Sequence, residues 1–439
     1  MVTTGGWKKN RDQKGKGRPM MLKRLYANNY RCLVNFEMHF DELTLLLGPN
    51  GGGKSTIFDL LFNIRHLIVD NAKISEVFPP EDLAAWVKQT EQSFEVDVES
   101  EEGLFSYRLV ISHNPDLKKQ RVELERLLFE GKPLFEFRHG EVSLYHDDHE
   151  PGPKYSFDWS VSALATIVSR PDNRKLTWFK KWLEMLFVVS LQPKAMTSEA
   201  EEESDWLNRD GTNFASWYRC ISQEHQDKIF QLTEKLREAI PGFHVFKLEQ
   251  AGKYRILKVG FASEEQKASP VFFDFEQLSD GQRVLVVLYA LLLGLKDLGH
   301  TVFLDEPENY IALPEIQPWL MELNTACGEG FPQAVIISHH PELIDYLGPE
   351  CGKWLERDPL GPTRVKKLPQ RIDDGLKLSD QKRTSLSAGS QSSGATMPIR
   401  RPDRRCATVV ADGLPGVPDQ NQTLAIGIED HATLCVPHA

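Results

Sequence analysis

Apolar residues early in the chain predict a buried strand and an amphipathic helix joined by a glycine-rich turn. The strand is the short apolar run at 43–47, which ends at Gly48. From 55 to 68, apolar residues recur at the i, i+3, i+4 spacing of a helix. A strand, a glycine-rich turn and a helix, in this order, form the usual frame of a phosphate-binding loop.

The rest of the chain predicts an α/β core with an antiparallel elaboration. Residues 94–145 alternate between apolar and polar positions, which favours antiparallel strands with hairpin turns at 130–132 and 139–141. Further helices and short buried strands are expected, at 176–187, 213–239, 284–295, 301–304 and 334–337. Short apolar strands that alternate with helices indicate a sheet with parallel strands.

The glycine-rich turn fits the pattern G-x-x-x-x-G-K-[ST] from Gly48 to Ser55. Its glycines let the backbone N–H groups approach phosphate oxygens, and the helix N-terminus adds favourable partial charge. Lys54 is expected to reach the β- and γ-phosphates of ATP, and the Ser55 hydroxyl is expected to ligate Mg²⁺. The predicted nucleotide-binding residues of this loop are Asn50, Gly51, Gly52, Gly53, Lys54, Ser55 and Thr56.

A second motif follows the apolar run at 301–304, where Asp305 and Glu306 end the predicted strand. Asp305 would lie at the carboxyl edge of the sheet, where it can hold Mg²⁺. Glu306 would be placed to orient or deprotonate the attacking water. Two solvated acids at a strand end are the alternative interpretation.

The segment Leu278-Ser279-Asp280-Gly281-Gln282 precedes the apolar helix at 284–295, and its small residues would present a phosphate-facing helix N-terminus. It resembles the Leu-Ser-Gly-Gly-Gln signature of ABC-type ATPases and differs from it only at Asp280. This resemblance implies nucleotide contacts by Ser279, Gly281 and Gln282. It also implies a γ-phosphate-sensing switch histidine at His339, and a Mg²⁺-binding glutamine at Gln192, for which a strand-end polar residue is the alternative.

The opening Asn29-Tyr30-Arg31-Cys32-Leu33, together with the motifs after residue 304, resembles the SMC, RecF and OLD group of ABC-type ATPases. The closest resemblance is to stand-alone AAA-type ATPases often found beside phage-defence genes, and it covers 21–378. OLD-like members often carry Gly-Leu-His-Pro after Glu-Asn, whereas this chain has Tyr310-Ile311-Ala312-Leu313-Pro314. No role is therefore carried over for that loop.

The resemblance implies an α/β fold, namely a P-loop ABC-type head with a mixed sheet, an antiparallel β lobe and an inserted helical lobe. The expected ATPase domain is 21–378, in which 69–270 is a β-rich and helical insertion. Residues 1–20 are expected to be a disordered basic extension. Residues 379–439 are expected to be a disordered tail, since no aromatic residue occurs after Trp354.

Composition narrows the classes of partner. The formal charge is −11 although residues 1–20 are basic, so the body is acidic and is not a general polyanion binder. No run reaches about 18 uninterrupted apolar residues, so no membrane is expected. Six scattered cysteines without a CxxC pair favour a reducing cytoplasm. Loop composition explains His146-Asp147-Asp148-His149 better than a metal site does.

The resemblance further implies a homodimer with two ATP molecules sandwiched between one copy's phosphate loop and the other copy's signature. The predicted function is an ATP-hydrolysing switch in DNA maintenance or anti-phage defence that controls a separate nuclease or toxin effector, with nucleic acid as a further candidate partner. Two alternatives stay open: the nucleotide-binding subunit of a membrane transporter, and an ATP-gated scaffold with negligible turnover.

Overall fold

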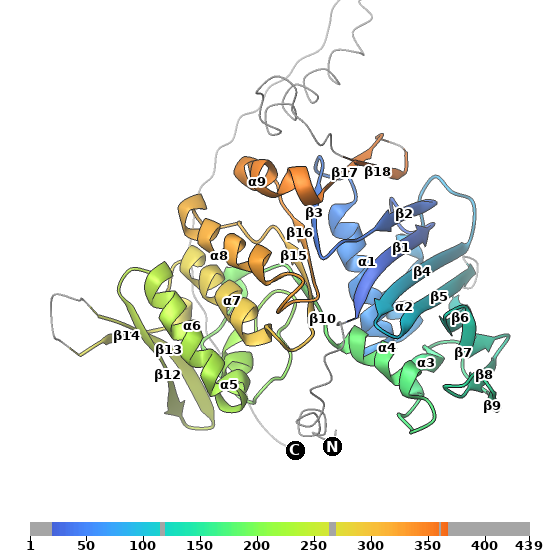
Figure 1. The fold of residues 1–439 in the computed structure, drawn as a ribbon, viewed down its shortest axis with the longest axis horizontal. Helices are drawn as coiled ribbons and strands as arrows, with labels where there is room; N and C mark the ends of the chain where they lie inside the picture. Colours follow the sequence, from blue (N-terminus) through green and yellow to red (C-terminus); the bar gives the residue numbers. More distant parts are fainter. Residues whose placement is uncertain (1–19, 115–118, 263–268, 360, 368–439) are drawn as a thin grey trace, which may run out of the picture. The chain divides into compact units, whose positions relative to one another are not determined.

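The computed structural model describes residues 20–114, 119–262, 269–359 and 361–367. Its centre is a six-stranded sheet in which five parallel strands are followed by one antiparallel edge strand, β18. Figure 1 shows this sheet between two groups of helices. The strand order is β10 (Leu186–Val189), β15 (Thr301–Asp305), β16 (Gln333–Ile337), β3 (Leu43–Leu47), β17 (Gly352–Arg357) and β18 (Thr363–Lys367).

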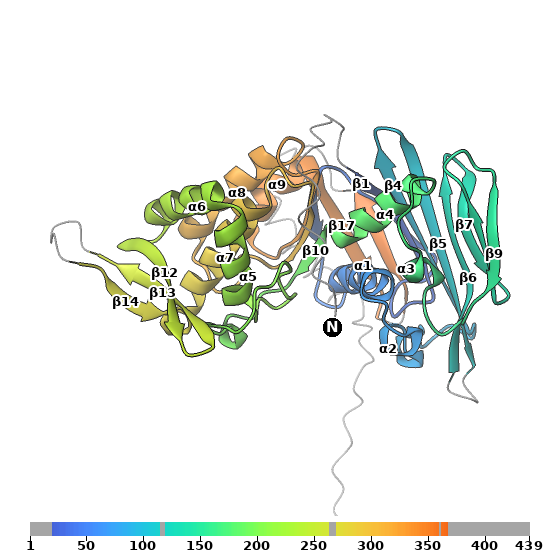
Figure 2. The same cartoon turned by 90° about the horizontal axis from the view of Figure 1, so that it is seen from below.

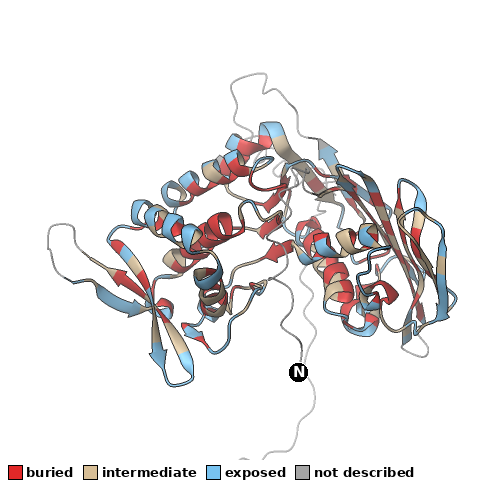
Figure 3. Ribbon diagram, turned by 60° about the horizontal axis from the view of Figure 1, so that its bottom comes forward, coloured by how far each residue is buried: buried red, intermediate tan, exposed pale blue. Residues whose placement is uncertain are grey.

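The central strands are buried on both faces, which explains why they read as continuous apolar runs in the sequence (Figure 3). Side chains alternate across the sheet, so Leu46 joins one hydrophobic cluster while Leu45 and Leu47 join the other. The first cluster includes α1 (Lys54–Val69), and the second includes α7 (Asp280–Leu295) and α8 (Leu313–Ala326). The helix α9 (Pro341–Cys351) follows β16.

An antiparallel sheet of eight strands covers α1 on the side away from the central sheet. Helices α3 (Ala163–Thr166) and α4 (Arg174–Glu184) pack on the same face of it as α1 does (Figure 2). In sheet order the strands are β2 (Phe36–His39), β1 (Met21–Asn28), β4 (Glu91–Ser100), β5 (Gly103–Asn114), β6 (Lys119–Phe129), β7 (Lys132–Arg138), β8 (Glu141–Tyr145) and β9 (Pro151–Ser156).

The hairpins predicted at 130–132 and 139–141 are confirmed, because β6–β7 and β7–β8 pair antiparallel around them. Both central residues of each turn have positive φ: 49° and 76° at Glu130 and Gly131, 52° and 78° at His139 and Gly140. This is the left-handed backbone that two-residue hairpins of a right-twisted sheet need.

A third region combines two helices with a small antiparallel sheet. The helix predicted at 213–239 is two helices, α5 (Phe214–Glu224) and α6 (Gln226–Ala239), because His225 between them leaves the helical backbone, with φ −135° and ψ 63°. The sheet has the order β11-β13-β12, with β14 also paired to β13. Its strands are β11 (Glu199–Ala200), β12 (Phe243–Ala251), β13 (Tyr254–Phe261) and β14 (Val271–Asp274).

The helix predicted at 176–187 ends earlier than expected, at Glu184, because Leu186–Val189 forms β10 at the edge of the central sheet. The predicted insertion 69–270 therefore contributes one strand to the core, and its β-rich and helical parts lie on either side of that strand in the sequence. Remaining short helices are α2 (Ile74–Val77) and the 3₁₀ turns η1 (Pro80–Asp82), η2 (Pro193–Ala195) and η3 (Phe275–Gln277).

These elements confirm the predicted α/β P-loop head with a mixed sheet, an antiparallel β lobe and a helical lobe. The predicted basic extension and the predicted tail at 379–439 lie outside the described residues, except for Met20, which packs against the core. Within the described ranges, no helix is long and apolar enough to cross a membrane.

Two fully buried polar side chains join elements that are distant in sequence. Gln333 at the start of β16 exchanges hydrogen bonds with the backbone N–H and C=O of Leu22 in β1, at 3.1 and 2.8 Å. Glu125 in β6 accepts four hydrogen bonds, from the Tyr107 and Ser162 hydroxyls and from the N–H groups of Ala163 and Leu164. Because all four donors point at one carboxylate, the start of α3 is fixed to the eight-stranded sheet.

This convergence predicts that Glu125→Gln destabilises the protein although the two side chains have the same shape. If the new NH₂ faced Ala163 and Leu164, two buried N–H donors would lose their acceptor, and if it faced Tyr107 and Ser162, both hydroxyls would have to turn to accept from it. We expect the free energy of unfolding to fall by about 1–3 kcal/mol, measured by urea denaturation. The exposed Glu102→Gln is the matched control and should leave the denaturation midpoint unchanged. Equal midpoints for Glu125→Gln and wild type would contradict this account.

Candidate nucleotide-binding site

The glycine-rich turn wraps closely around the N-terminus of α1. Gly51 and Gly53 have φ of 76° and 95°, in the left-handed region that side chains disfavour. A Cβ atom on Gly53 would lie 2.5 Å from Oγ1 of Thr363 in β18, so only glycine fits there. The buried Lys54 folds back over the turn, and its Nζ donates hydrogen bonds to the carbonyls of Gly48 and Pro49 at 3.0 and 3.1 Å. This is the backbone geometry of a phosphate-binding loop.

The sheet brings the second motif next to this loop. Strands β3 and β15 both pair in parallel with β16, so their carboxyl ends meet at one edge. The Ser55 hydroxyl donates a hydrogen bond to the Asp305 carboxylate. Burial raises the pKa of Asp305, the neighbouring Glu306 carboxylate raises it further, and the hydrogen bond from Ser55 lowers it. Two oxygen groups of the kind that Mg²⁺ prefers therefore lie together, and their role in Mg²⁺ binding stays a prediction.

The predicted catalytic pair is also brought together. His339 follows β16 by two residues, and its Nε2 lies 3.3 Å from Oε1 of Glu306. The other oxygen of Glu306 accepts a hydrogen bond from the Asn309 side chain at 2.8 Å. Glu306 adopts a φ of 49°, an unusual left-handed conformation for this residue type. Its carboxylate is therefore held by both its backbone and its neighbours.

Glu308 is a site residue for which the sequence analysis predicted no role. It is 8% exposed, and its Oε1 accepts hydrogen bonds from the Ser338 hydroxyl at 2.5 Å and from the His339 N–H at 3.1 Å. Glu308 thus joins the turn after β15 to the turn after β16. The sequence does contain a signal for Glu308, which is its place within Asp305-Glu306-Pro307-Glu308-Asn309. A third acidic side chain so close to the end of a strand needs a hydrogen-bond partner if it is buried.

A cleft of 610 Å³ opens over the phosphate loop, which is a volume in the range of small-molecule sites. The loop from Asn50 to Thr56 lines it together with Glu306 and His339. Seven further residues line the cleft that were not among the predicted site residues: Arg31, Cys32, Glu81, Leu83, Ala85, Trp86 and Arg357. Lys54 and His339 therefore line one hollow, while Asp305 does not line it and is joined to it through the hydrogen bond from Ser55.

Gln192 and the signature residues lie elsewhere. Gln192 has an exposed side chain three residues after β10 and does not line this cleft, so its predicted role in Mg²⁺ binding stays a prediction. Ser279 is the exposed N-cap of α7, and its hydroxyl accepts a hydrogen bond from the Gln282 N–H at 3.2 Å. The side-chain oxygen of Gln282 accepts a hydrogen bond from the Ser279 N–H, and this second bond completes a capping box.

Gly281 in the first turn of α7 has a steric reason to be glycine. A Cβ there would lie 2.6 Å from the Tyr310 carbonyl, in the loop that follows the catalytic strand. The signature helix and this loop are therefore packed backbone to backbone. The same contact shows that Tyr310, at which the chain departs from OLD-like sequences, belongs to the surroundings of the signature.

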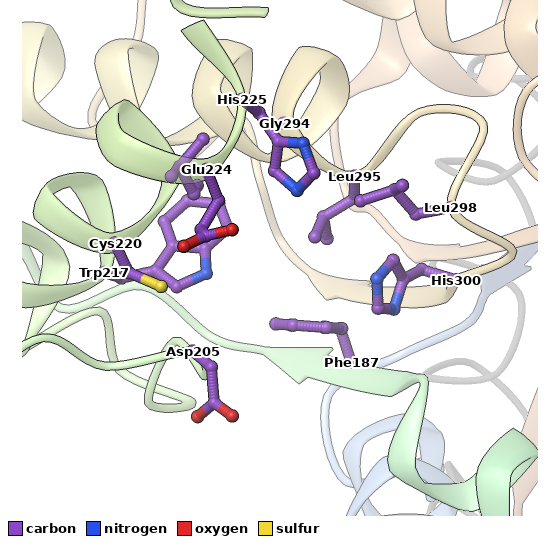
Figure 4. Close-up of a pocket in the computed structure, with 11 residues that line it drawn as sticks. Phe187, Asp205, Trp217, Cys220, Glu224, His225, Gly294, Leu295, Leu298 and His300 are labelled. Carbon is purple, nitrogen blue, oxygen red and sulfur yellow. The ribbon is translucent and has the colours of Figure 1, made fainter. Parts of the chain in front are cut away.

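A second pocket, drawn in Figure 4, has a different character. It lies between β10, α5 and α7, holds 20 Å³, about the space of a water molecule, and contains none of the predicted site residues. Burial lowers the pKa of its His300 to about 4, which keeps this histidine neutral. The pocket is lined by Phe187, Asp205, Trp217, Cys220, Ile221, Glu224, His225, Gly294, Leu295, Leu298 and His300.

The loop His146-Asp147-Asp148-His149 has a structural role. Asp147 accepts hydrogen bonds from the N–H groups of Arg174 and Lys175, and so caps the N-terminus of α4. His146 Nδ1 lies 3.1 Å from Asp172. Within the part of the chain that the structure describes, no group of three or more His, Cys, Asp or Glu side chains could hold a metal ion.

Comparisons with known families agree with this site. Residues 20–137 match the family model described as an AAA ATPase domain. Residues 223–345 match the model described as "AAA domain, putative AbiEii toxin, Type IV TA system". The first matched segment contains the phosphate loop, and the second contains the signature, Asp305, Glu306 and His339.

An OLD nuclease from Thermus scotoductus is 51% identical over 37 residues, which are 8% of this chain and 7% of that protein. Among solved structures, an Smc head bound to the C-winged helix domain of ScpA aligns over 82% of this chain and 99% of its own, at 11% identity and a TM-score of 0.48. The SMC head domain from Thermotoga maritima aligns over 79% and 99%, at 13% identity and a TM-score of 0.40. With TM-scores under 0.5, these structures carry no argument about this chain. The two family matches and the order of the motifs together show that the chain carries an AAA-type ATPase domain that resembles those of the SMC, RecF and OLD group.

Proposed function

We propose that this protein binds and hydrolyses ATP and uses the cycle as a molecular switch. The observation that carries the proposal is the convergence of Lys54, Ser55, Glu306 and His339 around one cleft, with Asp305 hydrogen-bonded to Ser55. Lys54 and the loop N–H groups would hold the phosphates, and the N-terminus of α1 would favour their negative charge. Ser55 and Asp305 would hold Mg²⁺, which when bound supplies charge neutralisation at the β- and γ-phosphates.

Glu306 would orient the attacking water and accept its proton. Asn309 holds one oxygen of the Glu306 carboxylate at 2.8 Å, so the other is directed toward His339 at 3.3 Å. The imidazole of His339 would contact the γ-phosphate, while Glu308 positions its backbone. A hydrogen-bonded general base of this kind typically contributes about 10²- to 10⁴-fold to a rate.

The position of the signature supports the proposal of dimerisation. Ser279 sits at the exposed tip of α7 and does not line the cleft of its own chain. In a C₂ arrangement, the tip of α7 from one copy would complete the phosphate site of the other. ATP would then join two copies, and hydrolysis would release them.

The switch is proposed to act in anti-phage defence or DNA maintenance, through a separate nuclease or toxin effector. Support comes from the matched family's description, which names a toxin–antitoxin system, and from the stretch similar to an OLD nuclease. Nucleic acid is a candidate partner. A nucleotide-binding subunit of a transporter and a scaffold with negligible turnover are the alternatives. DNA-stimulated ATP hydrolysis would favour the proposal over both.

Glu306→Gln should slow ATP hydrolysis by about 10²- to 10⁴-fold, because the amide cannot accept the proton of the attacking water. ATP binding should persist, since the phosphate loop is untouched, and an ATP-bound dimer should accumulate. Phosphate release gives the rate, and analytical ultracentrifugation gives the oligomeric state. The exposed Glu315→Gln on α8 is the matched control. Hydrolysis by Glu306→Gln at the wild-type rate would show that another group is the base.

Ser279→Arg tests the composite site. The bulky cation at the exposed tip of α7 should block approach of a second copy's phosphate loop, so ATP-dependent dimerisation should be lost while each monomer still binds ATP. Sedimentation in the Glu306→Gln background with and without ATP measures this. Thr325→Arg, on the exposed face of α8, is the control. A dimer that survives Ser279→Arg would rule out the sandwich arrangement.

A further inference from the structure

Resting on the proposed nucleotide site, we infer that the loop carrying Trp86, together with Arg357 of β17, forms the platform on which the nucleotide base stacks. Two chemically different sets of residues line the cleft. Lys54, Glu306 and His339 suit the phosphates. Trp86 and Arg357 have planar groups that suit an aromatic base.

Trp86 is placed for a ligand rather than for the core. Its side chain is 37% exposed, and it belongs to neither of the two hydrophobic clusters among the described residues. The Arg357 guanidinium lies over its ring, 5.0 Å from the centroid, while Arg357 Nε donates to the Gly361 carbonyl at 3.0 Å. A tryptophan and a stacked guanidinium at the rim of a polar cleft form a flat π surface that a base can extend.

The loop is fixed in place by Asn29, which begins the Asn29-Tyr30-Arg31 motif. Asn29 is fully buried and has a φ of 62°. Its side-chain NH₂ donates to the carbonyls of Gln89 and Glu91, at 2.8 and 2.9 Å, and its oxygen accepts from the Ala84 N–H at 3.2 Å. One side chain thus closes the loop on both sides of Trp86.

Arg31 provides a second anchor and ties the loop to α1. Its N–H donates to the Asp82 carbonyl at 2.7 Å, and its guanidinium binds the carboxylates of Asp82 and of Asp59 on α1. Because α1 begins at the phosphate loop, the Trp86 loop and the phosphate loop are held at a set separation. This assigns a purpose to the Asn29-Tyr30-Arg31 motif that the sequence alone left open: it positions the base platform.

The test distinguishes the contribution of the base to binding from the contribution of the phosphates. Isothermal titration calorimetry on the full chain with Mg²⁺ compares ATP, GTP and inorganic tripolyphosphate, which carries phosphates without a base. Trp86→Ala should weaken ATP and GTP binding by about 5- to 150-fold, the range for loss of base–aromatic stacking. Tripolyphosphate binding should not change. Trp86→Phe, which keeps an aromatic face, should restore most of the ATP affinity.

Trp159→Ala is the matched control, because Trp159 is also exposed, at 53%, and does not line the cleft. Thermal unfolding of each variant confirms that it folds. The inference is overturned if Trp86→Ala binds ATP as tightly as wild type, or if it weakens tripolyphosphate to the same degree, which would mark the loop as structural. Wild type that binds neither ATP nor tripolyphosphate would instead overturn the proposed function, and the platform with it.

Discussion

The site depends on the close approach of the phosphate loop to the hairpin β17–β18 behind it. A Cβ on Gly48 would lie 2.0 Å from the Leu355 carbonyl, and one on Gly53 would meet Thr363. The Thr363 hydroxyl also donates a hydrogen bond to the Gly52 carbonyl at 3.1 Å. The backbone of the phosphate loop packs closely against the hairpin β17–β18. This packing restricts the loop to a conformation in which its N–H groups can face an anion.

The carboxyl edge of the central sheet then determines which groups meet at this loop. Parallel pairing of β16 with both β3 and β15 places Ser55, Asp305 and the turn after Ile337 at the same edge. Hydrogen bonds between turns refine the arrangement, since Glu308 joins Ser338 to the turn after β15. A carboxylate buried there carries a desolvation penalty, which the two hydrogen bonds to Oε1 of Glu308 reduce.

Polar side chains also connect the eight-stranded sheet to the cleft over the phosphate loop. Gln333 fixes β1 to β16, and Asn29 and Arg31 continue from β1 to the loop that carries Trp86. Asp59 on α1 binds both Arg31 and Arg209, so the segment after β10 joins the same network. The antiparallel sheet therefore supports one wall of the nucleotide cleft, and Arg209 extends the network toward the helical part.

Local patterns in the sequence were sufficient for the elements whose signals are short in range. The strand at 43–47, the helix after it, the two-residue hairpins and the apolar helix at 284–295 all follow from periodicity and turn chemistry. The order of motifs also predicted which residues would meet, because parallel strands end at a common edge. The break at His225 and the start of β10 at Leu186 were missed, since helix periodicity continues through a single non-helical residue and a short apolar run fits either structure.

Only the tertiary structure brought Trp86, Glu308 and Arg357 into the site. Their contacts reach residues far away in the chain, since the Arg357 guanidinium lies over the Trp86 ring. In the same way, the Thr363 hydroxyl donates a hydrogen bond to the Gly52 carbonyl across 311 positions. No local periodicity encodes such pairs, because they arise from how β17 returns beside β3 and how Asn29 closes a loop some 55 residues later. The sequence determined the chemistry of the phosphate loop. The packing of distant segments decided which other residues line the cleft.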